Sequence, residues 1–247
     1  KVTAAVHKKL VGILDEDRVK TDAYERIFHA VGKSYRDLLR IRQGILPGAP
    51  DAVLYPKTTE EVVALVELAS AKKFAVIPYG GGSSVVGGVE AVAGTDHKGV
   101  WTLDLSQMNR LLDINATSMV AKVQAGAYGP KLEADLQAQG YTLGHYPQSF
   151  EFSTLGGWIA AKGAGQQSNR YGAADEFLVG ATVVSPNGTW ETRATIPHAS
   201  TGPDLNHLVA GSEGTMGIIT EATVKIHELP ASRDFRGYLF KTFADGA

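Results

Sequence analysis

A short apolar segment that runs into three consecutive glycines constrains this chain more than any other feature. Residues 74–77 are typical of a buried strand, and residues 78–84 continue as Pro-Tyr-Gly-Gly-Gly-Ser-Ser. Residues without Cβ allow successive backbone N–H groups to approach one anion closely. Because this loop contains no Lys or Arg, a bound diphosphate would be held by amide dipoles and the two serine hydroxyls. The alternative is a flexible Gly/Ser linker, but linkers seldom follow a β-branched strand so directly.

Glycine is more frequent than usual along the whole chain. The sequence has 28 glycines in 247 residues, whereas an average usage of about 7% would give roughly 17. The excess is clustered and is not spread as low-complexity sequence, so we expect several places where the backbone closely approaches another group. The clusters are Gly80–Gly82, Gly87–Gly88, Gly156–Gly157, Gly163 with Gly165, and Gly211 with Gly214 and Gly217.

Composition limits the classes of function. Hydrophobic residues make up 44% and charged residues 20%, and the net charge of −2 gives no electrostatic basis for binding nucleic acid or an anionic membrane. The absence of cysteine excludes disulfides, a thiol nucleophile and cysteine-ligated iron–sulfur clusters. No uncharged apolar window of about 18 residues occurs, so no transmembrane segment is expected. The compartment stays open, with the cytoplasm expected for a bacterial source.

The apolar pattern divides the chain into parts. Residues 1–48 are predicted to form amphipathic helices, and glycines and prolines between residues 44 and 50 end this segment. The main domain is expected over residues 49–229, with residues 230–247 as the start of a further domain. The spacing predicts one apolar helix face formed by Tyr24, Ile27, Phe28 and Val31. It predicts a second in the following segment, formed by Leu38, Leu39 and Ile41.

Residues 49–229 are predicted to fold as α+β, with a parallel unit followed by an antiparallel sheet. A strand at 52–55, a helix opened by Thr58 and Glu61 as a capping box, and the strand at 74–77 form the parallel unit. This topology places the glycine loop at the carboxyl end of a strand, where ligands bind in open α/β sheets. A helix is expected at about 130–139. A second run of strands, which we assign to the antiparallel sheet, is expected to begin at 100–105 and to continue at 111–115, 119–124, 177–184, 188–192 and 222–226.

Two further segments combine glycines with polar residues. Residues 147–158 place hydroxyls and a glycine pair ahead of a short helical stretch, and residues 211–219 form a glycine-punctuated turn before the last strand. Walker A, Gly-x-Gly-x-x-Gly, Gly-x-Ser-x-Gly and His-Glu-x-x-His motifs are absent, and the seven histidines lack metal-ligand spacing. The sequence therefore predicts no metal site, no Rossmann site and no serine hydrolase.

These three segments, in this order and spacing, resemble the FAD-binding (PCMH-type) domain of the vanillyl-alcohol oxidase/p-cresol methylhydroxylase superfamily. Segments 26–32, 39–44 and 200–205 are also similar to the alkyldihydroxyacetonephosphate synthases and bacterial FAD-linked oxidases within it. The resemblance covers about residues 22–240. It implies a two-subdomain fold, with a small parallel βαβ subdomain and an antiparallel sheet with flanking helices. It also implies FAD between the subdomains and, after residue 230, the first part of a substrate domain.

The resemblance implies which residues contact FAD. Residues 78–84 would hold the diphosphate, residues 148–154 and 161–164 would line the flavin and ribityl chain, and residues 213–219 would contact the adenine half or flavin edge. Relatives have Arg where this chain has Lys162, which keeps the charge without a bidentate fork. The implied contacts are Pro78, Tyr79, Gly80, Gly81, Gly82, Ser83, Ser84, Gln148, Ser149, Phe150, Glu151, Phe152, Ser153, Thr154, Ala161, Lys162, Gly163, Ala164, Glu213, Gly214, Thr215, Met216, Gly217, Ile218 and Ile219.

The resemblance also bears on how FAD is held and used. Covalent relatives attach FAD through a histidine or cysteine, and because the loop contains neither, we expect non-covalent binding. His145, just ahead of the second segment, is either an ordinary loop histidine or a group near the flavin that exchanges a proton with substrate. No other catalytic residue is assigned. Because every assigned motif serves the cofactor, we expect these 247 residues by themselves to be inactive.

The family's reaction is the leading expectation for function. In the ether-lipid synthases an acyl group on dihydroxyacetone phosphate is exchanged for an alkyl group, with flavin N5 as the covalent carrier. One alternative is an FAD-dependent dehydrogenase or oxidase of D-2-hydroxy acids such as D-lactate or glycolate, and another is a cofactor-binding fragment without turnover. The expected partners are a small-molecule or lipid-derived substrate and, by resemblance, a second copy of the chain.

Overall fold

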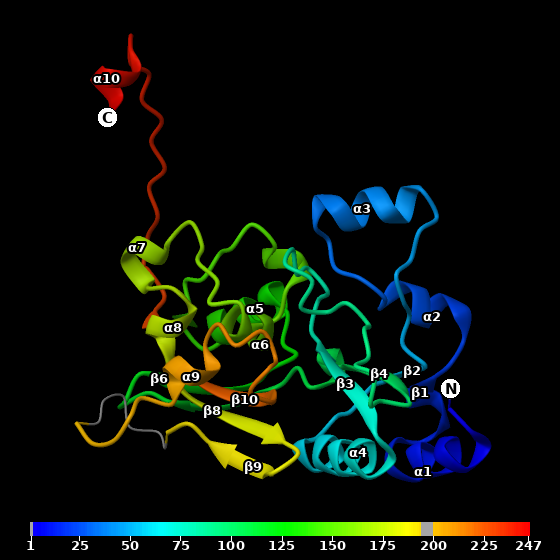
Figure 1. Cartoon of the computed structure of the whole chain (residues 1–247). Helices are drawn as coiled ribbons and strands as arrows, with labels where there is room; N and C mark the ends of the chain where they lie inside the picture. The colour runs from blue at the N-terminus through cyan, green and yellow to red at the C-terminus, as the bar shows by residue number, and fades with distance from the viewer. Residues whose placement is uncertain (1, 194–199) are drawn as a thin grey trace.

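Figure 1 shows helices arranged around two β-sheets, one built early in the chain and one built later. The computed structural model describes residues 2–193 and 200–247, so residue 1 of the expected N-terminal segment lies outside it. The first sheet has the order β1-β2-β4-β3 and the second β5-β6-β10-β8-β9, while β7 pairs with β11. The strands are β1 (Val19–Lys20), β2 (Ala52–Leu54), β3 (Phe74–Tyr79), β4 (Gly99–Asp104), β5 (Leu111–Asn115), β6 (Val120–Gln124), β7 (Tyr141–Thr142), β8 (Leu178–Ser185), β9 (Gly188–Glu191), β10 (Ile218–Lys225) and β11 (His227–Glu228).

The first sheet is mixed. Strands β2, β4 and β3 run parallel, with Tyr79 opposite Asp104 at their carboxyl ends, and β1 pairs antiparallel with β2. The predicted strand–helix–strand unit is present, and the glycine loop follows β3. The prediction that residues 100–105 belong to the later, antiparallel sheet was wrong, because this segment is β4 in the middle of the parallel strands. An almost unbroken buried run suits a strand that is covered on both faces, but it does not reveal which sheet receives that strand.

Helix α4 (Thr59–Lys72) connects β2 to β3 and begins where the sequence predicts. The Glu61 amide donates to Thr58 Oγ1 at 3.2 Å, which is one half of a capping box. The Glu61 carboxylate also accepts from the Lys57 amide at 2.6 Å and from Arg18 at 2.7 Å. The carboxylate therefore ties the start of α4 to the segment before β1.

The first hydrophobic core lies between the first sheet, α4 and α1 (Ala4–Leu14). Leu10 and Leu14 of α1 are fully buried in it, and Trp101 of β4 stacks on Phe74 with ring centroids 4.5 Å apart. Val184 and Ile218 of the second sheet belong to the same cluster, so the two sheets share buried contacts.

Helices α2 (Ala23–Phe28) and α3 (Tyr35–Arg42) leave most of their apolar face uncovered, and Figure 1 shows α3 standing apart from the sheets. Val31 and Tyr24 were predicted to lie on the same apolar helix face, but Val31 is only 2% exposed whereas Tyr24 is 73% exposed. Periodicity identifies residues that share a face, but it does not say whether another element covers that face. The other exposed members are Ile27, Phe28, Leu38, Leu39 and Ile41.

The second sheet contains the two predicted hairpins, β5–β6 and β8–β9, with β10 antiparallel to both β6 and β8. Its core includes Leu132, Trp158 and Phe177. The α+β fold with a small sheet followed by an antiparallel sheet is therefore as predicted. The remaining helical elements are α5 (Gly129–Gln137), α6 (Leu155–Ala160), α7 (Ser168–Tyr171), α8 (Ala174–Phe177), α9 (Asn206–Val209), α10 (Phe243–Gly246) and the 3-10 turns Glu16–Arg18, Leu105–Gln107 and Phe150–Phe152.

Candidate functional site

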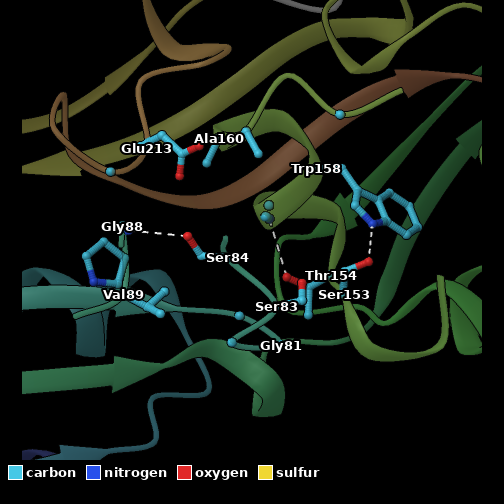
Figure 2. A pocket seen from close by; sticks show the side chains of 18 of the residues that line it. Gly81, Ser83, Ser84, Gly88, Val89, Ser153, Thr154, Trp158, Ala160 and Glu213 are labelled. Atoms are coloured by element: carbon cyan, nitrogen blue, oxygen red, sulfur yellow. Dashed lines mark hydrogen bonds between the residues drawn. The ribbon is translucent and has the colours of Figure 1, made fainter. Parts of the chain in front are cut away.

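A cavity of about 490 Å³ lies where the glycine loop meets the second and third glycine-containing segments (Figure 2). Its wall is formed by the loop after β3, the segment that leads into α6, α6 itself and the turn before β10. The structure thus brings together three segments that are far apart in the sequence. The predicted contacts that line the cavity are Pro78, Tyr79, Gly80, Gly81, Gly82, Ser83, Ser84, Gln148, Ser149, Ser153, Thr154, Ala161, Gly163, Ala164, Glu213, Gly214, Gly217 and Ile219.

Other predicted contacts lie away from this wall. Thr215, Met216 and Ile218 line a separate hollow beside the β8–β9 hairpin. Lys162 forms an ion pair with Asp175 at 3.1 Å. Phe150, Glu151 and Phe152 form a 3-10 turn behind the glycine loop. As FAD contacts, these residues stay predictions.

The cavity also has walls that the sequence reasoning did not assign. The glycine excess was a signal for Gly88, Gly156 and Gly157, and Pro147 and Trp158 lie within the second segment. Nothing local marks the other apolar residues, because they join the wall only through folding. The unassigned lining residues are Val85, Val86, Gly88, Val89, Leu105, Ala125, Pro147, Gly156, Gly157, Trp158 and Ala160.

The glycines of the loop pack so closely on the chain's own atoms that a Cβ would not fit, as Gly81 and Gly80 show. A Cβ on Gly81 would lie 1.8 Å from the Phe152 carbonyl oxygen, and one on Gly80 would lie 2.3 Å from Thr154 Oγ1. The loop therefore packs directly on the second segment. The glycine excess predicted close approaches of the backbone to another group. At Gly80 and Gly81 that group is another segment of the same chain.

The backbone amides of the loop form an unused row of donors. Within residues 2–193 and 200–247, the N–H groups of Gly81, Gly82, Ser83 and Ser84 donate to no protein acceptor. Backbone donors in folded proteins are almost always satisfied, by protein, water or ligand. A row of such donors on the wall of a cavity, at the carboxyl end of a parallel strand, is an arrangement that binds anions.

Glu213 is the one acidic or basic side chain among the described residues that line the cavity. Burial raises the pKa of its carboxyl group. Figure 2 shows the Glu213 side chain directed toward Gly88 and Ser84, and it lies so close to Gly88 that a Cβ there would be 2.8 Å from Glu213 Oε2. Since no Lys or Arg lines the wall, an anion in this cavity would be held by dipoles, as the loop sequence indicates. The carboxyl group can accept hydrogen bonds from hydroxyl groups of a ligand.

The hydroxyls of the second segment hold that segment in place. Trp158 Nε1 donates to Ser153 Oγ at 2.6 Å, and Ser153 Oγ donates to the Ser149 carbonyl at 2.7 Å. Thr154 caps α6 by accepting from the Gly157 amide at 3.4 Å (Figure 2). These hydroxyls were expected to serve the ligand, and the structure shows that they first serve the fold.

His145 is buried behind the cavity wall and does not line the cavity. Its side chain is 1% exposed and packs between Trp158 and Phe177, with ring centroids 4.8 and 5.1 Å away. Neither ring nitrogen has a hydrogen-bond partner among the described residues. Burial lowers the pKa of His145 to about 4, so the ring is neutral near pH 7. His145 is therefore not an ordinary exposed loop histidine, and its catalytic role stays a prediction.

The described part of the chain has neither a cluster of metal ligands nor a helix that could span a membrane. Residues 2–193 and 200–247 contain no group of three or more His, Cys, Asp or Glu side chains arranged to hold a metal ion. Over the same residues, no helix has the length and apolar character needed to cross a membrane.

Comparison with known proteins identifies the domain. The chain is 44% identical over 228 residues to the alkyldihydroxyacetonephosphate synthase of Dictyostelium discoideum, covering 92% of this chain and 37% of that protein. It is 33% identical over 244 residues to an uncharacterised FAD-linked oxidoreductase of Escherichia coli K12, covering 98% and 49%. A solved alkyldihydroxyacetonephosphate synthase structure matches with a TM-score of 0.87 and 41% identity, covering 94% of this chain and 42% of that one.

The chain therefore spans less than half the length of these relatives. Residues 50–193 match the family model described as the FAD binding domain, and this stretch contains the glycine loop and the second segment. As the sequence resemblance predicted, the chain belongs to the FAD-binding domain family.

Proposed function

We propose that this chain binds FAD non-covalently in the 490 Å³ cavity, as the cofactor domain of a flavoenzyme similar to alkyldihydroxyacetonephosphate synthase. The observation that carries this proposal is the row of backbone amides from Gly81 to Ser84, which lack a protein acceptor. A diphosphate has two negative charges, and in a cavity without Lys or Arg it needs several N–H donors. Family membership supports FAD over other diphosphate ligands.

The residues around the cavity suit the parts of FAD. Ser84 Oγ accepts from the Gly88 amide at 3.2 Å, which leaves its own proton for a phosphate oxygen. Gly157, Ala160 and Ala161 have small side chains or none, so they form a surface on which a planar ring can lie. The Glu213 carboxyl can accept hydrogen bonds from ribose or ribityl hydroxyls. When bound, FAD supplies an electron-accepting ring system, and the chain's own residues bind it, orient it and exclude water.

For the whole protein we propose the reaction of the synthase, in which an acyl group on dihydroxyacetone phosphate is exchanged for an alkyl group. The 44% identity to the Dictyostelium synthase supports this assignment. The 35% identity over 184 residues to the D-lactate dehydrogenase of Anaerostipes hadrus supports a second candidate, oxidation of a D-2-hydroxy acid. Both candidates use the same FAD domain, so the groups that distinguish them would come from the part of the relatives that this chain does not span.

The proposal is tested by retention of FAD. The purified chain is incubated with FAD, desalted and examined for the oxidised-flavin absorbance at about 450 nm. We expect one FAD per chain and its complete release into the supernatant on acid precipitation. Flavin that stays with the pellet would contradict non-covalent binding. Riboflavin is the control, because it lacks the diphosphate and leaves the amide row unused, and binding as tight as that of FAD would contradict the proposed role of the loop.

A further inference from the structure

His29 and Asp104 form a buried pair directly behind the glycine loop. His29 follows α2 and Asp104 ends β4, and their exposed fractions are only 1% and 6%. Asp104 is the register partner of Tyr79, the last residue of β3 before the loop. The pair therefore lies at the carboxyl ends of two adjacent parallel strands, and neither residue lines the cavity.

Hydrogen bonds fix the orientation of the His29 ring. Nδ1 lies 2.8 Å from the Glu25 carbonyl oxygen, which can only accept, and Nε2 lies 2.9 Å from Asp104 Oδ2. The other carboxylate oxygen, Asp104 Oδ1, accepts from the Ser106 amide at 2.8 Å. Because both ring nitrogens and both carboxylate oxygens are engaged, neither side chain can rotate without breaking a buried hydrogen bond.

The His29 ring supports Tyr79, and Tyr79 supports the loop. The ring centroids of His29 and Tyr79 are 4.5 Å apart, and Tyr79 is 2% exposed. Its hydroxyl has no hydrogen-bond partner in the described residues, and it lies so close to Gly82 that a Cβ there would be 1.9 Å from it. Gly82 has a φ of +66°, a conformation that side chains disfavour. A displacement of Tyr79 would therefore displace Gly82, and with it the loop amides that have no protein acceptor.

The segment after His29 contacts the end of the same loop. The Lys33 amide donates to the Ser84 carbonyl at 2.8 Å, and a Cβ on Gly32 would lie 2.2 Å from that oxygen. The Ala91 amide donates to the Ala30 carbonyl at 3.1 Å. The N-terminal segment thus contacts the loop around Ser84 and contacts the chain beyond it at Ala91.

We propose that His29 is a positioning residue for the cofactor. With Asp104 it holds Tyr79 beneath Gly82, and it anchors the segment that contacts Ser84, so the loop amides keep their anion-binding arrangement when the cavity is empty. This segment lies before residue 50, where the match to the family model begins. The inference rests on the proposed function, because the ligand assigned to the amides is the FAD diphosphate.

The test compares His29→Ala with Arg18→Ala in the full chain. Arg18 is also buried, at 5%, and its ion pairs with Glu61 at 2.7 Å and Asp15 at 3.0 Å lie away from the loop. Both variants remove a buried ion-pairing side chain, so both are expected to lower the unfolding temperature. Only His29→Ala is expected to weaken FAD binding, with Kd raised about 10- to 100-fold because the binding-competent loop population falls to about 1–10%.

A second measurement separates this role from the proposed function. In the FAD-free chain, hydrogen exchange at residues 80–84 is expected to be faster in His29→Ala than in Arg18→Ala, and added imidazole is expected to slow it again. If His29→Ala does not fold, His29→Gln replaces it, since Gln keeps a donor for Asp104 but has no ring against Tyr79. Equal Kd values and equal loop exchange in the His29 and Arg18 variants would overturn the inference. If the unmodified chain binds no FAD, the proposed function fails, and loop exchange alone decides the role of His29.

Discussion

Replacing Gly157 by Ala is expected to raise the stability of the FAD-free chain while weakening FAD binding. The two glycines of α6 differ in what surrounds them. A Cβ on Gly156 would lie 2.8 Å from Ala125 Cβ, whereas one on Gly157 would have only Thr154 Oγ1 within 4 Å, at 3.4 Å. Because Gly157 lines the cavity and its Cβ position is otherwise open, a methyl group there would occupy space that we assign to the ligand.

Gly157→Ala is expected to increase the stability of the chain but to decrease its affinity for FAD. Replacing a helical glycine by alanine stabilises by up to about 1 kcal/mol, which for a chain of this size raises the unfolding temperature by at most about 2–4 °C. A methyl group forced against a closely packed ligand costs about 1–3 kcal/mol. Since about 1.4 kcal/mol corresponds to a tenfold change in affinity, Kd for FAD is expected to rise roughly 5- to 150-fold.

The assay measures both quantities on the same protein. Thermal unfolding is followed without FAD, and Kd is measured by titrating FAD and following its fluorescence. Gly12→Ala is the matched control, because Gly12 is also helical, has nothing within 4 Å of its Cβ position and lies in α1, outside the cavity lining. The reasoning is refuted if Gly157→Ala binds FAD as tightly as Gly12→Ala, or if the alanine lowers the unfolding temperature.

The remaining predictions concern two buried ionisable residues. The pKa of His145 is about 4 in the folded chain, whereas a histidine in the unfolded chain has a pKa of about 6.5. Between these two pH values the unfolded state binds more protons than the folded state. The free energy of unfolding therefore falls as the pH is lowered from about 6.5 to about 4. We therefore measure the free energy of unfolding with denaturant at pH values from 4 to 8. Between these pH values the unmodified chain is expected to lose up to about 3 kcal/mol more than His145→Phe. Equal pH dependence of the two proteins would contradict this prediction. Glu133 is 5% exposed and accepts from Thr142 Oγ1 at 2.8 Å and from the Leu143 and Gly144 amides at 3.0 Å each. Glu133→Ala is expected to cost about 3 kcal/mol or more in the free energy of unfolding, since the Thr142 hydroxyl, the Leu143 amide and Gln137 Nε2 lose their acceptor, while the Gly144 amide keeps Thr142 Oγ1. The partly exposed α5 control Asp135→Ala should cost less than about 1 kcal/mol; equal costs would show that these hydrogen bonds contribute little.

The local sequence was sufficient to find the glycine-containing segments that meet at the cavity. Glycine, proline and hydroxyl residues report what the backbone must do at one place, so the loop at residues 78–84 and the turn at 211–219 could be located without coordinates. The two hairpins and the helix over residues 129–137 were predicted for the same reason, since periodicity and turn residues act over a few neighbouring positions. The resemblance to FAD-binding domains rests on these local segments and their spacing.

Pairing and burial were decided only by the tertiary structure. Residues 99–104 join the parallel sheet through contacts with β2 and β3, and no local pattern distinguishes that partner from an antiparallel one. His29 is buried against Asp104, which is 75 positions away in the chain. Ser153 is engaged by Trp158, and Gly81 is pressed against Phe152. A side chain's neighbours depend on which distant segments pack around it, and so the sequence located the loop while only the fold showed what holds it in place.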